Sequence, residues 1–121
     1  MKILVCGSRD WNDYTAIRRE LDKLYHIQVE RDALIIIQGG ARGADAIARG
    51  WAERNGVPCV QVDANWVFYG KSAGPISNEW MLRLDPDLVL AFSVDLDHSK
   101  GTKNMVTQAL KAGVKVLSFE A

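Results

Sequence analysis

The chain has 121 residues, of which 48 % are hydrophobic and 25 % are charged, as expected for one globular domain spanning residues 1–121. Its 15 lysine and arginine residues balance 15 aspartate and glutamate residues, so the chain lacks the overall positive charge that is typical of nucleic-acid-binding proteins. No apolar run approaches the roughly 18 residues of a membrane span, and the opening MKILVCGS indicates a strand rather than a signal peptide, which favours a cytoplasmic protein without membrane contact.

Short β-rich runs alternate with helical periodicity along the chain, and this alternation predicts βαβ units in an α/β fold. In chain order the expected elements are a strand at 2–6, a helix after Asn12 or Asp13, a strand at 33–37, a helix from Ala44 that ends at Gly56, a strand at 58–62, a helix at about 76–84, a strand at 88–92, a helix at about 102–112 and a strand at 114–119. The segment 63–72 has no clear period, and 93–100 is expected to be a polar loop.

Five parallel strands with right-handed crossovers most naturally take the order 3-2-1-4-5, which gives a Rossmann-like sheet with helices on both faces. In that order the first and fourth strands are neighbours, and the second strand lies beside the first. These same three strands precede the glycine-bearing turns at Gly7, at 39–43 and at Gly101. Because such sheets bind ligands at the carboxyl ends of their strands, the turns predict one shared crevice.

The glycine turns have the features of a phosphate site. Glycine lets the backbone approach a ligand, and a helix N-terminus offers unpaired N–H groups with a partial positive charge. The guanidinium group of Arg9 suits a phosphate or carboxylate, although this side chain could instead be solvated in a tight turn. We expect the ligand to contact Gly7, Ser8, Arg9, Trp11, Gly39, Gly40, Ala41, Arg42, Gly43, Ala44, Asp45, Trp66, Lys71, Ser72, Asn78, Gly101 and Thr102.

Several side chains have two interpretations at this stage. Asp45 lies in the first turn of its helix, where it could only cap the helix or could accept a hydrogen bond from a ribose hydroxyl. Trp66 or Tyr69 could stack on a base or only anchor their loop to the core. The acids and the imidazole of 93–100 could contact a ligand, a metal ion or only water. Two isolated cysteines and two scattered histidines form no metal-site pattern, so neither a metal nor a cofactor is expected.

Four motifs in order, GSRDW, GGARGAD, WVFYGKSAGPISN with Met81 shortly after, and KGTKNM, resemble the SLOG superfamily, most closely its YspA/cpYpsA-related branch. The resemblance covers nearly the whole chain. It implies a Rossmann-like fold and a nucleotide or nucleotide-derived ligand. Relatives include the LOG phosphoribohydrolases, which release a base from a nucleoside monophosphate, and the Rossmann domain of DprA, which binds single-stranded DNA.

The last turn departs from the pattern of the LOG enzymes. In those enzymes this turn resembles the pattern PGGxGTxxE, and its glutamate acts on the ribose. The corresponding segment of this chain is DHSKGTKNM. Gly101 and Thr102 match, but Met105 stands at the position of the glutamate, and methionine can neither polarise water nor stabilise a positively charged ribose. The resemblance therefore supports phosphate binding and leaves catalysis in doubt.

Three functions remain open from the sequence. The first is a binding module that senses or sequesters a ribose-phosphate ligand. The second is an N-glycosidic hydrolase with a substitute carboxylate, for which Asp45 is the best candidate, with Asp95, Asp97 and Glu79 behind it. The third is a DprA-like nucleic-acid binder, against which the neutral net charge argues. A homodimer or higher homo-oligomer is also expected, because SLOG proteins commonly form dimers and Trp51 and Trp80 are large groups to leave exposed.

Overall fold

The chain forms a five-stranded parallel sheet between two layers of helices in a computed structural model that describes residues 1–27 and 33–120. The elements are β1 (Lys2–Gly7), α1 (Tyr14–Ile27), β2 (Ile35–Gln38), α2 (Ala44–Asn55), β3 (Cys59–Gln61), α3 (Trp66–Tyr69), η2 (Gly70–Ser72), α4 (Ala73–Leu82), β4 (Leu88–Ser93), η3 (Leu96–His98), α5 (Lys100–Lys111) and β5 (Lys115–Glu120). The strand order is β3-β2-β1-β4-β5, which confirms the predicted Rossmann-like topology.

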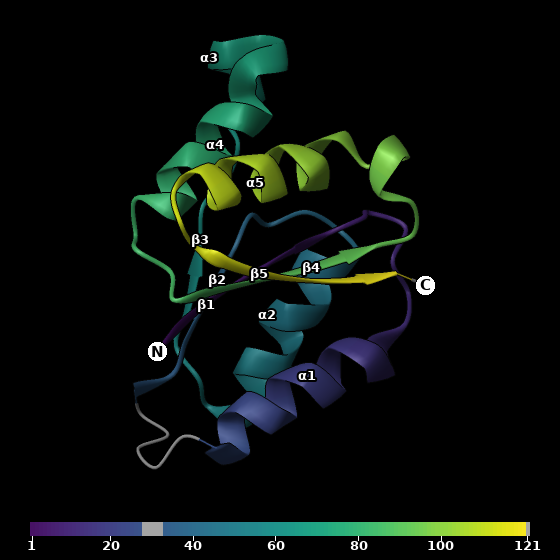
Figure 1. Cartoon of the computed structure of the whole chain (residues 1–121), viewed down its shortest axis with the longest axis vertical. Helices are drawn as coiled ribbons and strands as arrows, with labels where there is room; N and C mark the ends of the chain where they lie inside the picture. Colours follow the sequence, from purple (N-terminus) through teal and green to yellow (C-terminus); the bar gives the residue numbers. More distant parts are fainter. Residues whose placement is uncertain (28–32, 121) are drawn as a thin grey trace.

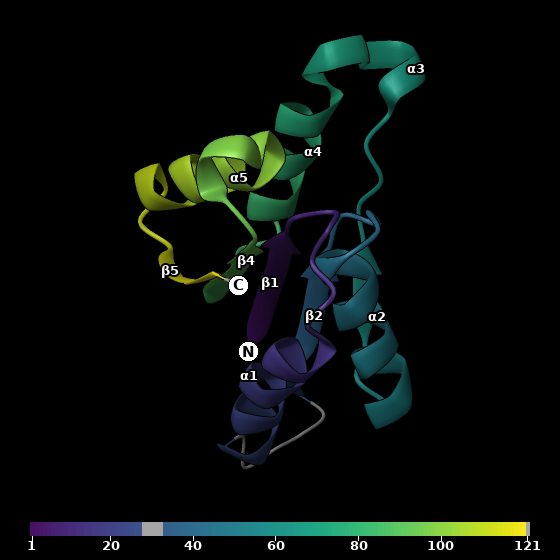
Figure 2. The same cartoon turned by 90° about the vertical axis from the view of Figure 1, so that its right-hand side faces the viewer.

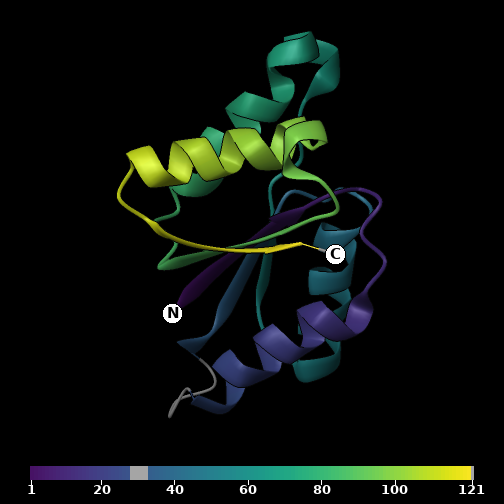
Figure 3. The same ribbon diagram turned by 45° about the vertical axis from the view of Figure 1, so that its right-hand side comes forward.

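The helices divide between the two faces of the sheet, with α1 and α2 on one face and α4 and α5 on the other (Figures 1 and 3). The central strand β1 supplies both faces, because successive side chains of a strand point in opposite directions. Ile3 and Val5 belong to the hydrophobic cluster with α1 and α2, whereas Leu4 and Cys6 belong to the cluster with α4 and α5. The continuous apolar run of β1 is therefore buried on both sides.

Local signals in the sequence set the ends of the first two helices. Asp13 caps α1, since its Oδ1 accepts a hydrogen bond from the Ala16 N–H at 3.1 Å. Gly56 ends α2 in the left-handed conformation with φ of 65°, which glycine adopts without steric cost. Trp51 lies on the buried stripe of α2, and its indole N–H donates to Asp22 at 2.9 Å.

Two helices begin earlier than expected. α4 starts at Ala73 and not near residue 76, because Pro75 falls in the first turn, where a backbone N–H has no partner to lose. α5 starts at Lys100 and not near residue 102, so Gly101 lies inside its first turn. The segment without a clear period contains the single turn α3, which Asn65 caps by accepting from the Phe68 N–H at 3.0 Å.

The α3 turn projects beyond the helical layer, at the end of α4 that lies away from the sheet (Figure 2).

At the opposite edge of the sheet from β3, β5 packs its Phe119 ring on Phe92 with 4.8 Å between the ring centroids. Within residues 1–27 and 33–120, no helix combines the length and the apolar character needed to cross a membrane.

Candidate functional site

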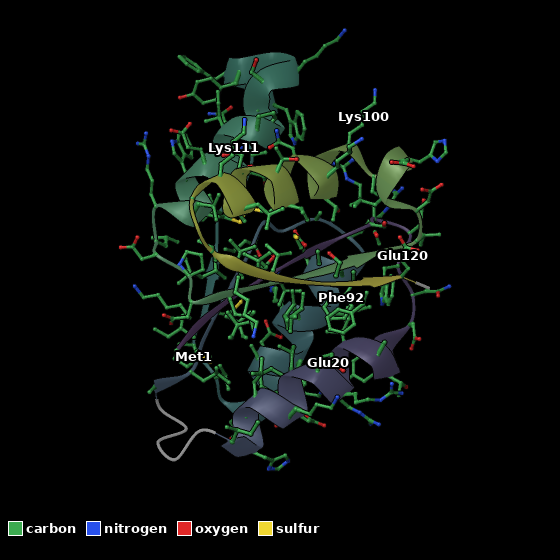
Figure 4. All side chains as sticks on the ribbon, viewed as in Figure 1. Met1, Glu20, Phe92, Lys100, Lys111 and Glu120 are labelled. Atoms are coloured by element: carbon green, nitrogen blue, oxygen red, sulfur yellow. The ribbon has the colours of Figure 1, made fainter. Side chains whose placement is uncertain are left out.

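A cleft of about 1010 Å³ lies at the carboxyl edge of the sheet. Its walls come from the segments that follow β1, β2, β3 and β4, together with the beginnings of α4 and α5. Lys100 marks the cleft end of α5 in Figure 4, and Lys111 marks the far end of that helix. This is the edge at which parallel α/β sheets bind their ligands, and β1 and β4 form the switch point of the strand order.

The cleft brings together most of the residues expected at a site. Those that line it are Gly7, Ser8, Arg9, Gly39, Gly40, Ala41, Arg42, Asp45, Trp66, Asn78, Gly101 and Thr102. Five expected residues lie elsewhere. Trp11 is buried edge-on against Phe92 at a centroid distance of 5.4 Å, and Ala44 is fully buried. Gly43 is packed under the β1 loop, while Lys71 and Ser72 are exposed on η2.

Gly7 allows three elements to meet at the floor of the cleft. A Cβ at this position would lie 2.2 Å from the carbonyl oxygen of Phe92 and 2.6 Å from the Cβ of Ala44. Next to it, the Ser8 hydroxyl accepts from the Val94 N–H at 3.0 Å and hydrogen-bonds to the Ser99 hydroxyl at 2.7 Å. The β1 loop and the segment leading to α5 are therefore joined directly.

Asp45 organises the glycine loop that follows β2. Its Oδ2 accepts hydrogen bonds from the N–H groups of Gly39 at 3.1 Å and Ala41 at 3.3 Å. Burial raises the pKa of this carboxyl to about 6, although the two N–H groups and the Arg9 guanidinium favour its charged form. Asp45 thus holds the loop in shape, and its carboxyl takes up a proton at a higher pH than an ordinary aspartate does.

The first turn of α2 is less open to a ligand than the sequence indicates. Gly43 has φ of 80°, and a Cβ there would lie 2.3 Å from the carbonyl oxygen of Ser8. That same carbonyl accepts a long hydrogen bond, 3.4 Å, from the Ala44 N–H. The β1 loop therefore covers the beginning of this helix, and the open part of the glycine loop is 39–42.

The first turn of α5 is open by contrast. Its N-cap residue, Ser99, makes no side-chain hydrogen bond to the helix, and a Cβ on Gly101 would meet nothing within 4 Å. Asn78 of α4 holds this turn in place, since its Nδ2 donates to the Gly101 carbonyl at 3.2 Å and to Asn104 at 3.0 Å. The unpaired N–H groups of a helix start thus face space that a ligand can fill.

Arg9 and Trp66 both line the cleft and lie close to each other. The guanidinium carbon lies 6.0 Å from the centroid of the tryptophan ring, at the outer limit of a cation–π contact. The Trp66 side chain stays half exposed at 51 %. It packs near Gly74, where a Cβ would lie 3.4 Å from the ring. An aromatic surface and a positive group therefore lie side by side in the cleft.

The segment between β4 and α5 also lines the cleft, a role that the sequence alone did not decide. Asp95 and His98 line it and are joined by a 2.5 Å contact between Oδ2 and Nδ1. This hydrogen bond raises the pKa of His98 and lowers the pKa of Asp95. Asp97 points elsewhere and pairs with Lys103 at 3.8 Å. Within the described residues, no three His, Cys, Asp or Glu side chains are grouped to hold a metal ion.

Met105 does not reach the cleft. It is fully buried in the cluster that packs α4 and α5 against the sheet, with Leu4, Cys6 and Met81 among its members. The position that carries the LOG glutamate is therefore part of the hydrophobic core here.

Several residues that line the cleft were not predicted from the sequence, namely Asp10, Asp63, Ser77, Ser99 and Lys100. Asp63 follows the third strand, and its position at a strand end was a usable signal. Ser99 gave no such signal, because its role depends on the path of 94–99 toward Ser8.

The fold and the cleft define a Rossmann-like α/β protein with an open cleft at its switch point. Residues 1–69 match the family model of the YspA, cpYpsA-related SLOG family. The Gene 61 protein of Mycobacterium phage D29 is 38 % identical to the chain over 124 residues, which span 98 % of this chain and 95 % of that protein. The chain therefore belongs to the YspA, cpYpsA-related SLOG family.

Proposed function

We propose that the protein binds a nucleotide or a nucleotide-derived ribose-phosphate ligand in this cleft, as a module that senses or sequesters it. The observation that carries the proposal is the convergence of the glycine loop 39–42 and the open first turn of α5 on one cleft. Membership of the SLOG family is consistent with a nucleotide-related ligand.

The polar groups suggest how such a ligand would lie. Its phosphate would accept hydrogen bonds from the first-turn N–H groups of α5, next to the Thr102 hydroxyl. Arg9 would balance the phosphate charge from the β1 side. Its base would stack on the exposed ring of Trp66, because every base has a flat face that an aromatic side chain can cover.

A second candidate function is hydrolysis of an N-glycosidic bond, and it draws on Asp45. A carboxyl with its pKa raised to about 6 suits general acid or base chemistry near neutral pH. Its Oδ2, however, already accepts two backbone N–H groups. Residue 105 is also a methionine buried in the core, so no carboxylate is present at the position that LOG enzymes use. Binding without turnover is therefore the function we favour.

A thermal-shift panel of nucleoside monophosphates, NAD, ADP-ribose and cyclic dinucleotides tests the proposal, followed by chromatography of each mixture for released base. We expect stabilisation by at least one nucleotide, since a ligand that prefers the native state adds RT ln(1 + [L]/Kd) to the free energy of unfolding. The variant Arg9→Gln should lose this stabilisation, and Arg18→Gln, an exposed position on α1 outside the cleft, should keep it. Release of free base would favour the hydrolase, and no shift with any member of the panel would refute both functions.

We also propose that the protein forms a homodimer through its projecting apolar turn. Val67 and Phe68 of α3 are exposed at 101 % and 76 %, and Trp80 of α4 at 38 %. Such a group of apolar side chains is typical of an interaction surface. Light scattering should give twice the chain mass of 13.4 kDa, and a monomer mass at working concentration would exclude this assembly.

A further inference from the structure

We infer that Asp63 binds the ribose hydroxyls of the ligand, so that the site accepts nucleotides with a free 2′,3′-diol and discriminates against 2′-deoxy and 2′-phosphorylated forms. This inference rests on the proposed nucleotide-binding function. It narrows the proposed ligands to ribonucleotides with a free diol, because it concerns the sugar rather than the phosphate or the base.

The first observation is the position of Asp63 in a βαβ unit. β2, α2 and β3 form such a unit, and the glycine loop joins β2 to α2. Asp63 follows the end of β3 and comes about 20 residues after Gly43. In dinucleotide-binding βαβ units an acidic residue at about this separation accepts hydrogen bonds from the ribose.

The second observation is a chain of side-chain hydrogen bonds that positions the carboxylate. Gln38 is fully buried, and its Nε2 donates to Gln61 Oε1 at 2.9 Å. Gln61 Nε2 in turn donates to Asp63 Oδ1, also at 2.9 Å. The same Gln38 accepts from the Gly40 N–H through its Oε1 at 2.5 Å. The buried Gln38 amide therefore contacts the glycine loop directly and is linked to the Asp63 carboxylate through Gln61.

Only a glycine at position 40 allows the glycine loop to lie this close to the Asp63 carboxylate. A Cβ on Gly40 would lie 2.5 Å from Asp63 Oδ1, and the residue has φ of 76°. The carboxylate thus stands directly beside the backbone that would hold a ligand. Within the described residues, its second oxygen, Oδ2, makes no hydrogen bond, which leaves it available to accept from a hydroxyl.

The other carboxylates of the cleft are already engaged. Asp45 is only 7 % exposed and accepts two backbone N–H groups. Asp10 lies 3.9 Å from Arg42, and Asp95 contacts His98 at 2.5 Å. In the part of the chain that the structure describes, Asp63 is the exposed cleft carboxylate that forms no ion pair, and its hydrogen-bond partner is the neutral Gln61. A ribose diol can therefore bind to it without displacing an ion pair.

The ribose preference can be measured by calorimetry on the full chain with two pairs of probes, AMP with 2′-deoxy-AMP and NAD with NADP. A hydrogen bond to a charged group corresponds to a preference of roughly 10- to 100-fold for AMP over its deoxy form. NAD should bind better than NADP, because the 2′-phosphate of NADP would meet the Asp63 carboxylate.

Two variants and one control make the test specific. Asp63→Ala should bind AMP and 2′-deoxy-AMP equally, whereas Asp63→Asn should keep part of that preference and bind NADP nearly as well as NAD. Glu53→Ala removes the same charge from the exposed face of α2 and should behave as the wild type. Circular dichroism of each variant reports whether it is folded.

The outcomes separate this inference from the proposed function. If the wild type binds AMP and its deoxy form equally, or if Asp63→Ala retains the wild-type preference, Asp63 does not read the ribose although nucleotide binding stands. If no probe of either pair and no nucleotide of the thermal-shift panel binds, the proposed function fails and this inference fails with it.

Discussion

Replacing Gly101 by alanine should stabilise the fold and weaken ligand binding at the same time. Gly101 lies in the first turn of α5 with an ordinary helical φ, and a Cβ there would meet nothing within 4 Å. Alanine is favoured over glycine in helices by about 1 kcal/mol at most, and less near an end. The free energy of unfolding should therefore rise by roughly 0.5 kcal/mol.

The same methyl group would occupy the cleft, which Gly101 lines. If a phosphate rests on this turn, the added atom prevents its close approach, and the affinity should fall by about tenfold or more, equivalent to roughly 1.4 kcal/mol. Urea unfolding measures the first effect, and calorimetry with the nucleotide that gives the largest thermal shift measures the second. A variant with lower stability would contradict the packing argument, and unchanged affinity would contradict the position of the phosphate.

Two further substitutions test the floor of the cleft. Gly7→Ala should destabilise the protein by about 3 kcal/mol, because the added Cβ would lie 2.2 Å from the Phe92 carbonyl oxygen, which cannot move without disturbing β4. Thermal unfolding should then show a Tm lower by roughly 10 °C, and an unchanged Tm would refute the close packing. Asp45 holds its proton more tightly in the native state, with the pKa raised from 3.8 to about 6, so the free energy of unfolding should fall as pH rises from about 4 to above 6, by on the order of 3 kcal/mol in total. Asp45→Asn should remove this dependence in urea unfolding between pH 4 and 8, and parallel curves for the two proteins would show that Asp45 is not its source.

The sheet topology could be predicted because its signals are local and repeated. The buried strands β1 and β4 are continuous apolar runs, and each is followed by a glycine or polar turn. The α3 turn could not be predicted, since four residues are too few to show helical periodicity. The early start of α4 was missed for a different reason, because Gly74 and Pro75 are typical of a loop and are tolerated only in the first turn.

Residues of the cleft could be predicted where their position follows from the end of a strand. They could not be predicted where their position depends on a partner that is distant in the sequence. Gly7 ends β1 and Gly39 follows β2, and these strands are neighbours in the sheet, so the place of both glycines in the cleft follows from the topology. The burial of Ala44 does not, because it requires the β1 loop to cross the start of α2. The connection between Gln38, Gln61 and Asp63 likewise appears only when β2 and β3 are paired in register.

The charges around the cleft favour a ligand with few phosphates over a nucleic acid. The charged side chains on its walls are Arg9, Arg42, Lys100, Asp10, Asp45, Asp63 and Asp95, together with His98. Three permanent cations therefore face four carboxyl groups, one of which, Asp45, has its pKa raised to about 6 by burial. Grooves that follow a nucleic-acid backbone are strongly positive and lose affinity steeply with salt. A small ligand that is held by backbone N–H groups at α5 and by its ribose hydroxyls at Asp63 needs no such excess of positive charge. We therefore expect its affinity to change little between 50 and about 200 mM salt.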